Sequence, residues 1–152
     1  MRYVLLITIL SLLFVACKKD SGGSAPQISY VSLSSNTASQ AVVNQGPILT
    51  IHVKDADGDL GFIQGSDTSF VFVKNLLSGI LDSIPFPDID GNTGKNFSSD
   101  VLVSLSPILG DSLGTSGARI DTLYFQVYVK DFAQHVSDTI VTPEPVYYYI
   151  QQ

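Results

Sequence analysis

The sequence is short of the residues on which many small extracellular and catalytic domains depend. Its 152 residues include one cysteine, no tryptophan and two histidines. A single cysteine excludes an intrachain disulfide, and two histidines without further cysteines do not suggest a zinc site. The cysteine and tryptophan markers of antibody domains are also absent. Any similarity to such domains would therefore have to be recognised from the pattern of strands alone.

Basic residues and helix-forming residues are scarce as well. The 8 Lys and Arg residues stand against 14 Asp and Glu residues, which gives a net charge of −6. Phosphate binding needs clustered Lys and Arg, so the composition argues against nucleic acid as a partner. Glu144 is the single glutamate, whereas Asp, Gly, Ser and Asn, which build turns, are abundant. We expect one domain made of strands and turns.

The N-terminal segment predicts export and lipid attachment. Residues 1–16 hold one arginine and then an apolar run shorter than the ~20 residues that span a bilayer, which is typical of a signal peptide. The stretch FVAC, ending at Cys17, resembles the lipobox of bacterial lipoproteins, where the cysteine is diacylated and becomes the first residue after cleavage. The alternative is an ordinary secretory signal with a chance cysteine. A lipidated Cys17 would hold the protein on a membrane and leave no free thiol.

The residues that follow predict where the anchor lies. Residues 17–25 comprise the lipidated cysteine and a polar, Gly/Ser-rich stretch that predicts a flexible tether. Lys18, not Asp, follows Cys17, so the inner-membrane retention signal known from other bacteria is missing. We therefore expect an outer-membrane location in the cell envelope, and the sequence leaves open whether the protein faces the periplasm or the exterior.

From Pro26 onward the pattern is one of repeated strands. PILTIHVK places Ile51 and Val53 on one face, and DTLYFQVYVK alternates between apolar and polar positions. VSDTIVT and VYYYI close the chain, and PEP between them predicts a bend or bulge in a final strand. Seven or so strands over residues 26–152 predict an all-β fold, a single immunoglobulin-like antiparallel β-sandwich, with a small barrel as the alternative.

Two aspartate-rich loops follow the pattern D-x-D-G-[DN]-x-G. Oxygen-bearing side chains at alternate positions can converge on calcium, but both loops lack the glycine at position 6 and the glutamate at position 12 of an EF-hand. Tight turns are the alternative, because Asp and Gly also favour turns. In an immunoglobulin-type order the loop after the sixth strand lies beside the first of these loops, which adds a fourth carboxylate. The predicted structural Ca²⁺ ligands are Asp55, Asp57, Asp59 and Asp131, and the possible second loop offers Asp88, Asp90 and Asn92.

These motifs carry a family resemblance. KDADGDLGF after an early strand, with DTLYFQVYVKDFAQHVSDTIVT near the C-terminus, resembles a group of Bacteroidota-type lipoproteins with an Ig-like or cadherin-like domain. The resemblance covers most of residues 26–152, and Gln134 stands where glycine is common. It implies an envelope location and a β-sandwich, and no activity, since such proteins are mostly of unknown function.

Signals of catalysis and of glycan chemistry are weak. GDSLG, residues 110–114, matches two hydrolase motifs, but Ser112 lies in a Gly/Ser-rich connection without a following helix, so we expect no enzyme. Four D-[ST]-apolar tripeptides resemble O-glycosylation sites and are also typical of strand starts. The expected function is that of a monomeric, non-enzymatic interaction or structural module that contacts an envelope protein or glycan. The alternative is a carbohydrate-binding accessory module whose exposed tyrosines would be Tyr124, Tyr128, Tyr147, Tyr148 and Tyr149.

Overall fold

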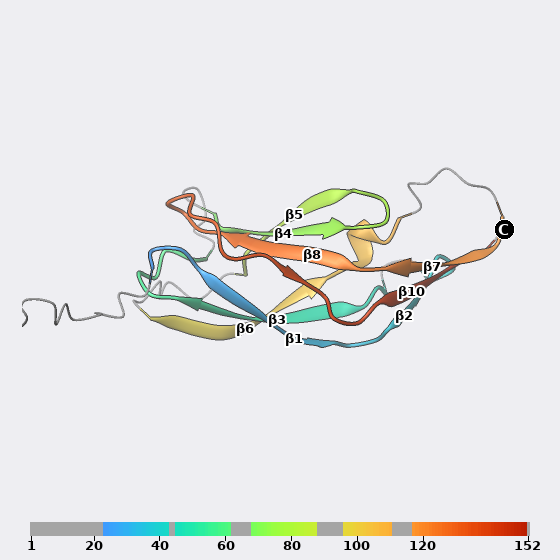
Figure 1. Cartoon of the computed structure of the whole chain (residues 1–152), viewed down its shortest axis with the longest axis horizontal. Coiled ribbons are helices and arrows are strands. Elements are labelled where there is room, and N and C mark those ends of the chain that lie inside the picture. Colours follow the sequence, from blue (N-terminus) through green and yellow to red (C-terminus); the bar gives the residue numbers. More distant parts are fainter. Residues whose placement is uncertain (1–22, 43–44, 62–67, 88–95, 111–116, 152) are drawn as a thin grey trace, which may run out of the picture.

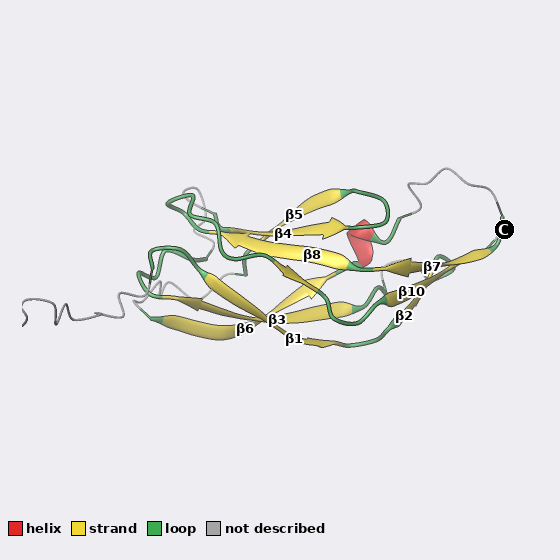
Figure 2. Ribbon diagram, viewed as in Figure 1, coloured by secondary structure: helices red, strands yellow, loops and turns green. Residues whose placement is uncertain are grey.

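The computed structural model describes residues 23–42, 45–61, 68–87, 96–110 and 117–151, and all of its long elements are strands. Figures 1 and 2 show these strands arranged mainly in two layers that face each other. Among the described residues no helix is long and apolar enough to cross a membrane. The strands, in chain order, are β1 (Gln27–Leu33), β2 (Thr37–Ser39), β3 (Ile48–Asp55), β4 (Phe70–Asn75), β5 (Leu81–Pro85), β6 (Phe97–Ser104), β7 (Arg119–Leu123), β8 (Phe125–Lys130), β9 (Ile140–Val141) and β10 (Val146–Ile150), and a 3₁₀ helix, η2, covers Ser106–Ile108.

The described residues form three sheets. One has the order β1-β3-β6, the second β5-β4-β8-β9 and the third β2-β10-β7. Among the described strands every pairing is antiparallel except that of β2 with β10, which is parallel. In Figure 1 the first two sheets form the lower and upper layers, and the small third sheet continues them toward the C-terminus. The expectation of an all-β, mostly antiparallel fold is confirmed.

The alternation of apolar and polar residues builds the core between the layers. Ile51 and Val53 of β3 are fully buried, as the sequence predicts, while His52 and Lys54 point to the other face. Strand β4 buries Val71 and Val73 from the opposite layer in the same way. The predicted core positions of DTLYFQVYVK are all at most 2% exposed, namely Leu123, Phe125, Val127 and Val129.

The long predicted strand DTLYFQVYVK is divided at Tyr124 between two sheets. Strand β7 pairs with β10, whereas β8 pairs with β4 and β9. Strands β9 and β10 flank the PEP segment, so the interruption predicted there separates the partner strand into the same two parts. Thr142 joins the halves, because its hydroxyl accepts from Phe125 N at 3.1 Å and its own N–H donates to Phe125 O at 2.9 Å.

Candidate metal centre

The loop after β3 folds around a buried carboxylate. Asp55 is 3% exposed, and its Oδ2 accepts from the backbone N–H groups of Gly58 at 2.9 Å and Asp59 at 3.1 Å. Gly58 has a φ of 77°, which a residue with a side chain rarely adopts. The turn predicted as the alternative to an ion site is therefore present. It leaves Asp55 Oδ1 buried and without a hydrogen-bond partner.

The loop after β8 is built around a second buried carboxylate. Asp131 is fully buried, and its Oδ1 accepts from His135 N at 2.7 Å. Its Oδ2 lies 3.1 Å from Nδ1 of the same histidine. Gln134 has a φ of 70° and takes the left-handed conformation for which glycine is the easier residue. The departure from glycine noted in the sequence is thus accommodated with the turn intact.

Backbone and side-chain hydrogen bonds join the two loops. Phe132 N donates to Asp59 O at 3.0 Å, and Ala133 N donates to Asp59 Oδ2 at 3.2 Å. Asp131 lies close enough to Asp59 for its charge to contribute to a raised pKa of the Asp59 carboxyl, after burial as the larger cause. The loop after β8 therefore does fold back beside the aspartates of the loop after β3, although the two are about 76 residues apart in sequence.

The carboxylates of this pole are held at an electrostatic cost. Burial is the main cause that raises the pKa of Asp55 to about 6, and the neighbouring Asp57, by charge and by side-chain contact, is the next. Asp59 adds a smaller repulsion. Asp59 Oδ1, like Asp55 Oδ1, is buried without a hydrogen-bond partner. Two buried oxygens without donors beside further negative charge are an arrangement that a bound cation relieves.

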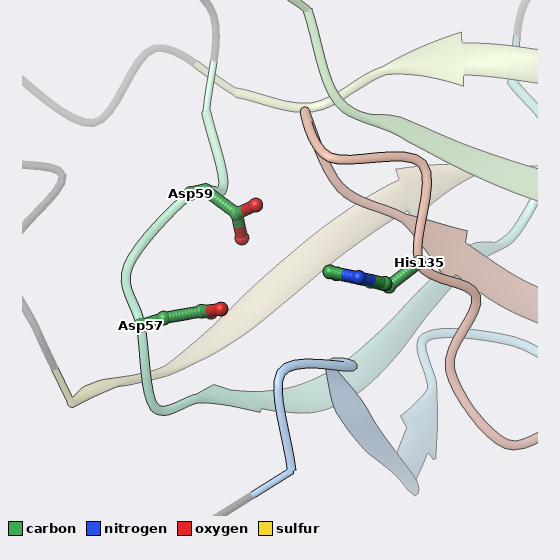
Figure 3. Close-up of side chains that lie close together, drawn as sticks. All are labelled: Asp57, Asp59 and His135. Atoms are coloured by element: carbon green, nitrogen blue, oxygen red, sulfur yellow. The ribbon is translucent and has the colours of Figure 1, made fainter.

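Three side chains from the two loops converge on one point. One carboxylate oxygen each of Asp57 and Asp59 and one ring nitrogen of His135 all lie within 4.8 Å of one another. Figure 3 shows both aspartates pointing toward His135 from the facing loop. Asp57 is exposed, and the other two are partly buried. These residues form a possible metal-binding group, which we call the pole cluster.

The pole cluster differs from the predicted ligand set. It contains Asp57 and Asp59, whereas Asp131 directs its carboxylate to His135 and Asp55 directs one oxygen to its own loop. His135 was missed, because two histidines without further cysteines did not suggest a metal site. The signal that could have found it is the D-x-x-x-H spacing of residues 131–135, which places a histidine beside a carboxylate at the end of a strand.

Several predicted sites lie outside the described residues. These are Cys17, the second loop with Asp88, Asp90 and Asn92, and Ser112. Of the tripeptides that resemble glycosylation sites, the described Ser83 is exposed on the edge strand β5.

The tyrosines do not form one face. Tyr147 and Tyr149 are exposed on one side of β10, and Tyr148 between them is 7% exposed and belongs to the core. Tyr128 lies on β8 in another sheet and stacks on Phe72, with ring centroids 4.8 Å apart and an interplanar angle of 7°. The alternation of a strand explains the inward Tyr148, because adjacent residues point to opposite faces. The prediction that all five tyrosines are exposed is therefore wrong for Tyr148, and the remaining tyrosines do not share one sheet surface.

A second histidine cluster lies on the outer face of β3 and β6. His52 Nδ1 is 2.7 Å from Asp100 Oδ1, and His52 Nε2 is 3.1 Å from Ser98 Oγ. The order Ser–His–Asp matches that of a hydrolase triad. The Asp100 side chain is, however, 54% exposed, whereas a triad aspartate is buried. We interpret the cluster as a cross-strand surface network.

Comparison with known proteins leaves the family open. No family model, no curated protein and no solved structure matches the chain. The family resemblance of the two loop motifs therefore stays a prediction, and the function has to be argued from the site itself.

Proposed function

We propose that the chain is a lipid-anchored, non-enzymatic module of the outer membrane, an immunoglobulin-like sandwich whose anchored pole is held together by a structural divalent cation. The observation that carries the proposal is the buried, unpartnered Asp55 Oδ1, which neighbours Asp57 and Asp59 of the pole cluster. The cation would join the loop after β3 to the loop after β8. An ion bound only by carboxylates and water would be calcium, as predicted from the sequence.

The strand arrangement supports the immunoglobulin-like part of the proposal. Strands β1, β3 and β6 correspond to the A, B and E strands of such domains, and β4 and β8 correspond to C and F. Strands β9 and β10 together take the place of G, because β9 pairs with β8 and β10 pairs with β7. The parallel pair of β2 and β10 follows from the chain crossing between the layers after β1.

The position of the N-terminal segment supports an anchored pole. A groove lined by Gly23, Ala25, Asp55 and Ala56 places the end of the predicted tether beside the loop after β3. Ile28 N donates to Asp138 Oδ1 at 3.0 Å, and this hydrogen bond connects the start of β1 to the segment that follows the loop after β8. At about 3.5 Å per residue, the six residues from Cys17 to Gly23 reach about 20 Å. A lipid on Cys17 would therefore hold the pole cluster near the membrane.

The opposite end carries an apolar turn suited to a protein partner. The turn between β4 and β5 exposes Leu76, Leu77 and Ile80, and β5 begins with the exposed Leu81, each by at least 37%. Asn75 holds it rigid: its Oδ1 accepts from Leu77 N and Ser78 N, and its Nδ2 donates to Ile108 O at 3.0 Å. Exposed apolar groups on a preorganised turn are typical of an interaction site. The occupant we propose is an envelope protein with an apolar groove.

Two experiments test the two ends. Thermal unfolding of the full chain in chelator and in 1 mM CaCl₂ should differ, since a Kd of about 0.1 mM adds about 1.4 kcal/mol. Asp57→Ala should abolish the difference, and Asp82→Ala, which alters an aspartate on β5, should leave it intact.

For the partner, a photo-crosslinking residue at position 77 should give one defined cross-linked product in cells, and the same residue at Val31 on β1 should give none. Equal products at both positions would refute the docking role of the turn.

A further inference from the structure

The pole cluster presents a nitrogen atom as well as carboxylate oxygens. Nδ1 of His135 lies 3.1 Å from Asp131 Oδ2, and Asp131 is fully buried. An ionised carboxylate only accepts hydrogen bonds, so Nδ1 carries the proton and donates it. Nε2 then has a free lone pair, and it is the ring atom left to bind an ion together with Asp57 and Asp59.

This arrangement is the one that metal-binding histidines use. Such a histidine almost always donates its second ring N–H to a carboxylate or a carbonyl, which fixes the tautomer and the ring orientation. Here Asp131 takes that role, and it also accepts His135 N at 2.7 Å, so both the backbone and the ring of the histidine are fixed. Asp131 would accordingly be a positioning residue and not a ligand.

The ligand types favour a different ion from calcium. Calcium takes oxygen ligands, whereas imidazole suits zinc and related transition ions. We propose that the pole cluster binds a zinc-class ion through Asp57, Asp59 and Nε2 of His135, with Asp131 positioning the imidazole. The inference rests on the proposed function, because it names the ion of the same site. The sequence did not suggest zinc, because its two histidines are accompanied by only one cysteine.

The buried Asp55 is a second observation that points to an ion. Its Oδ1 has no partner and lies on a side chain 3% exposed, beside Asp57 and Asp59. A water molecule on the ion's fourth position could donate to such an oxygen, since zinc sites with three protein ligands keep an open position. Tetrahedral bonds of about 2.0 Å place ligand atoms about 3.3 Å apart. The three atoms now lie within 4.8 Å of one another, so small side-chain rotations would bring them to that spacing.

Titration of the full chain with metal ions tests the inference. The protein is the untagged Cys17→Ser variant in detergent, so that no thiol competes for the ion, and the probes are ZnCl₂ and CaCl₂, each followed by calorimetry and by thermal unfolding. His135→Gln replaces the nitrogen ligand with an amide oxygen. His52→Gln removes the other histidine and is the matched control. Asp57→Asn is a second test at an exposed position, and unfolding in chelator verifies that each variant is folded.

The inference predicts that Zn²⁺ binds more tightly than Ca²⁺ and raises the unfolding temperature. His135→Gln should weaken Zn²⁺ binding by about 100-fold and Asp131→Asn by 10-fold or more, while His52→Gln has no effect. If Ca²⁺ stabilises the protein and His135→Gln leaves both ions unaffected, the zinc inference is wrong and the proposed function stands. Loss of Zn²⁺ binding in His52→Gln alone would place the ion at the other histidine and overturn the inference. If neither ion binds, both proposals fail.

Discussion

The substitution Asp55→Asn should stabilise the protein in chelator and reduce the further stabilisation that a cation adds. The amide keeps the acceptor for Gly58 N and Asp59 N. Its NH₂ group can donate toward the Asp57 carboxylate, which the Asp55 carboxylate now repels. In chelator the variant should therefore be more stable than the wild type. At saturating cation it should lose part of the gain that the wild type obtains, because it offers the ion less negative charge.

The size of the effect follows from the pKa. The folded state raises the pKa of Asp55 from 3.8 to about 6, and each unit corresponds to about 1.4 kcal/mol. The ionised carboxylate thus lowers the free energy of unfolding by up to about 3 kcal/mol. Replacing it with an amide removes this cost but also weakens the hydrogen bonds from Gly58 N and Asp59 N, which offsets about 1 kcal/mol of the gain. A net gain of about 2 kcal/mol in chelator at pH 7.5 should raise the unfolding temperature by about 8 °C.

The pH dependence gives the same reasoning a second test. A raised pKa means that the folded state holds the Asp55 proton more tightly than the unfolded chain does. Stability of the wild type in chelator should therefore increase as the pH falls from about 7 toward 4, and the advantage of Asp55→Asn should vanish over the same range. Urea unfolding at pH 7.5, 6 and 4.5 measures both. A variant that is less stable than the wild type in chelator at pH 7.5 would refute the electrostatic account of this loop.

Three further predictions concern the rest of the molecule. Asn75→Ala should lower the free energy of unfolding, measured in urea, by about 2 to 3 kcal/mol, because it leaves the buried Ile108 O and two turn N–H groups without partners. Ser83→Ala is the control. A loss below about 0.5 kcal/mol, no larger than that of the control, would contradict the role of Asn75 in holding the turn. A fluorophosphonate should label no serine, and mass spectrometry that found the label on Ser98 or Ser112 would show that the chain is an enzyme. Polysaccharides should not retard the protein in affinity electrophoresis, and retardation lost in the double variant Tyr147→Ala, Tyr149→Ala would favour the carbohydrate-binding alternative.

Strand identity was predictable wherever one face of a strand is buried. The alternation around Ile51 and Val127 is enough to place those residues in the core, since a shift of one residue would expose the whole apolar face. The proximity of the Asp131 loop to Asp59 was also predictable, because the strand order expected of an immunoglobulin-like sandwich, and not the local sequence, brings the two loops to one pole.

Features set by contacts between distant segments were not predictable. The division of the long strand at Tyr124 depends on the hydrogen bonds between Phe125 and Thr142, and the parallel pairing of β2 depends on where the chain changes layers. The part played by His135 depends on a side-chain rotamer that points it at Asp57 and Asp59. The run of three tyrosines suggested a shared surface. Only the orientation of β10 relative to the core determines that Tyr148 points inward while Tyr147 and Tyr149 point to solvent.

The most direct test of the central claim is the unfolding temperature of the full chain in chelator and after addition of each divalent cation, for the wild type and Asp57→Ala. The account predicts that at least one of Ca²⁺ and Zn²⁺ raises the wild-type temperature by several degrees and leaves that of Asp57→Ala unchanged. Identical temperatures with and without both ions in the wild type would contradict it, as would an equal rise in the variant.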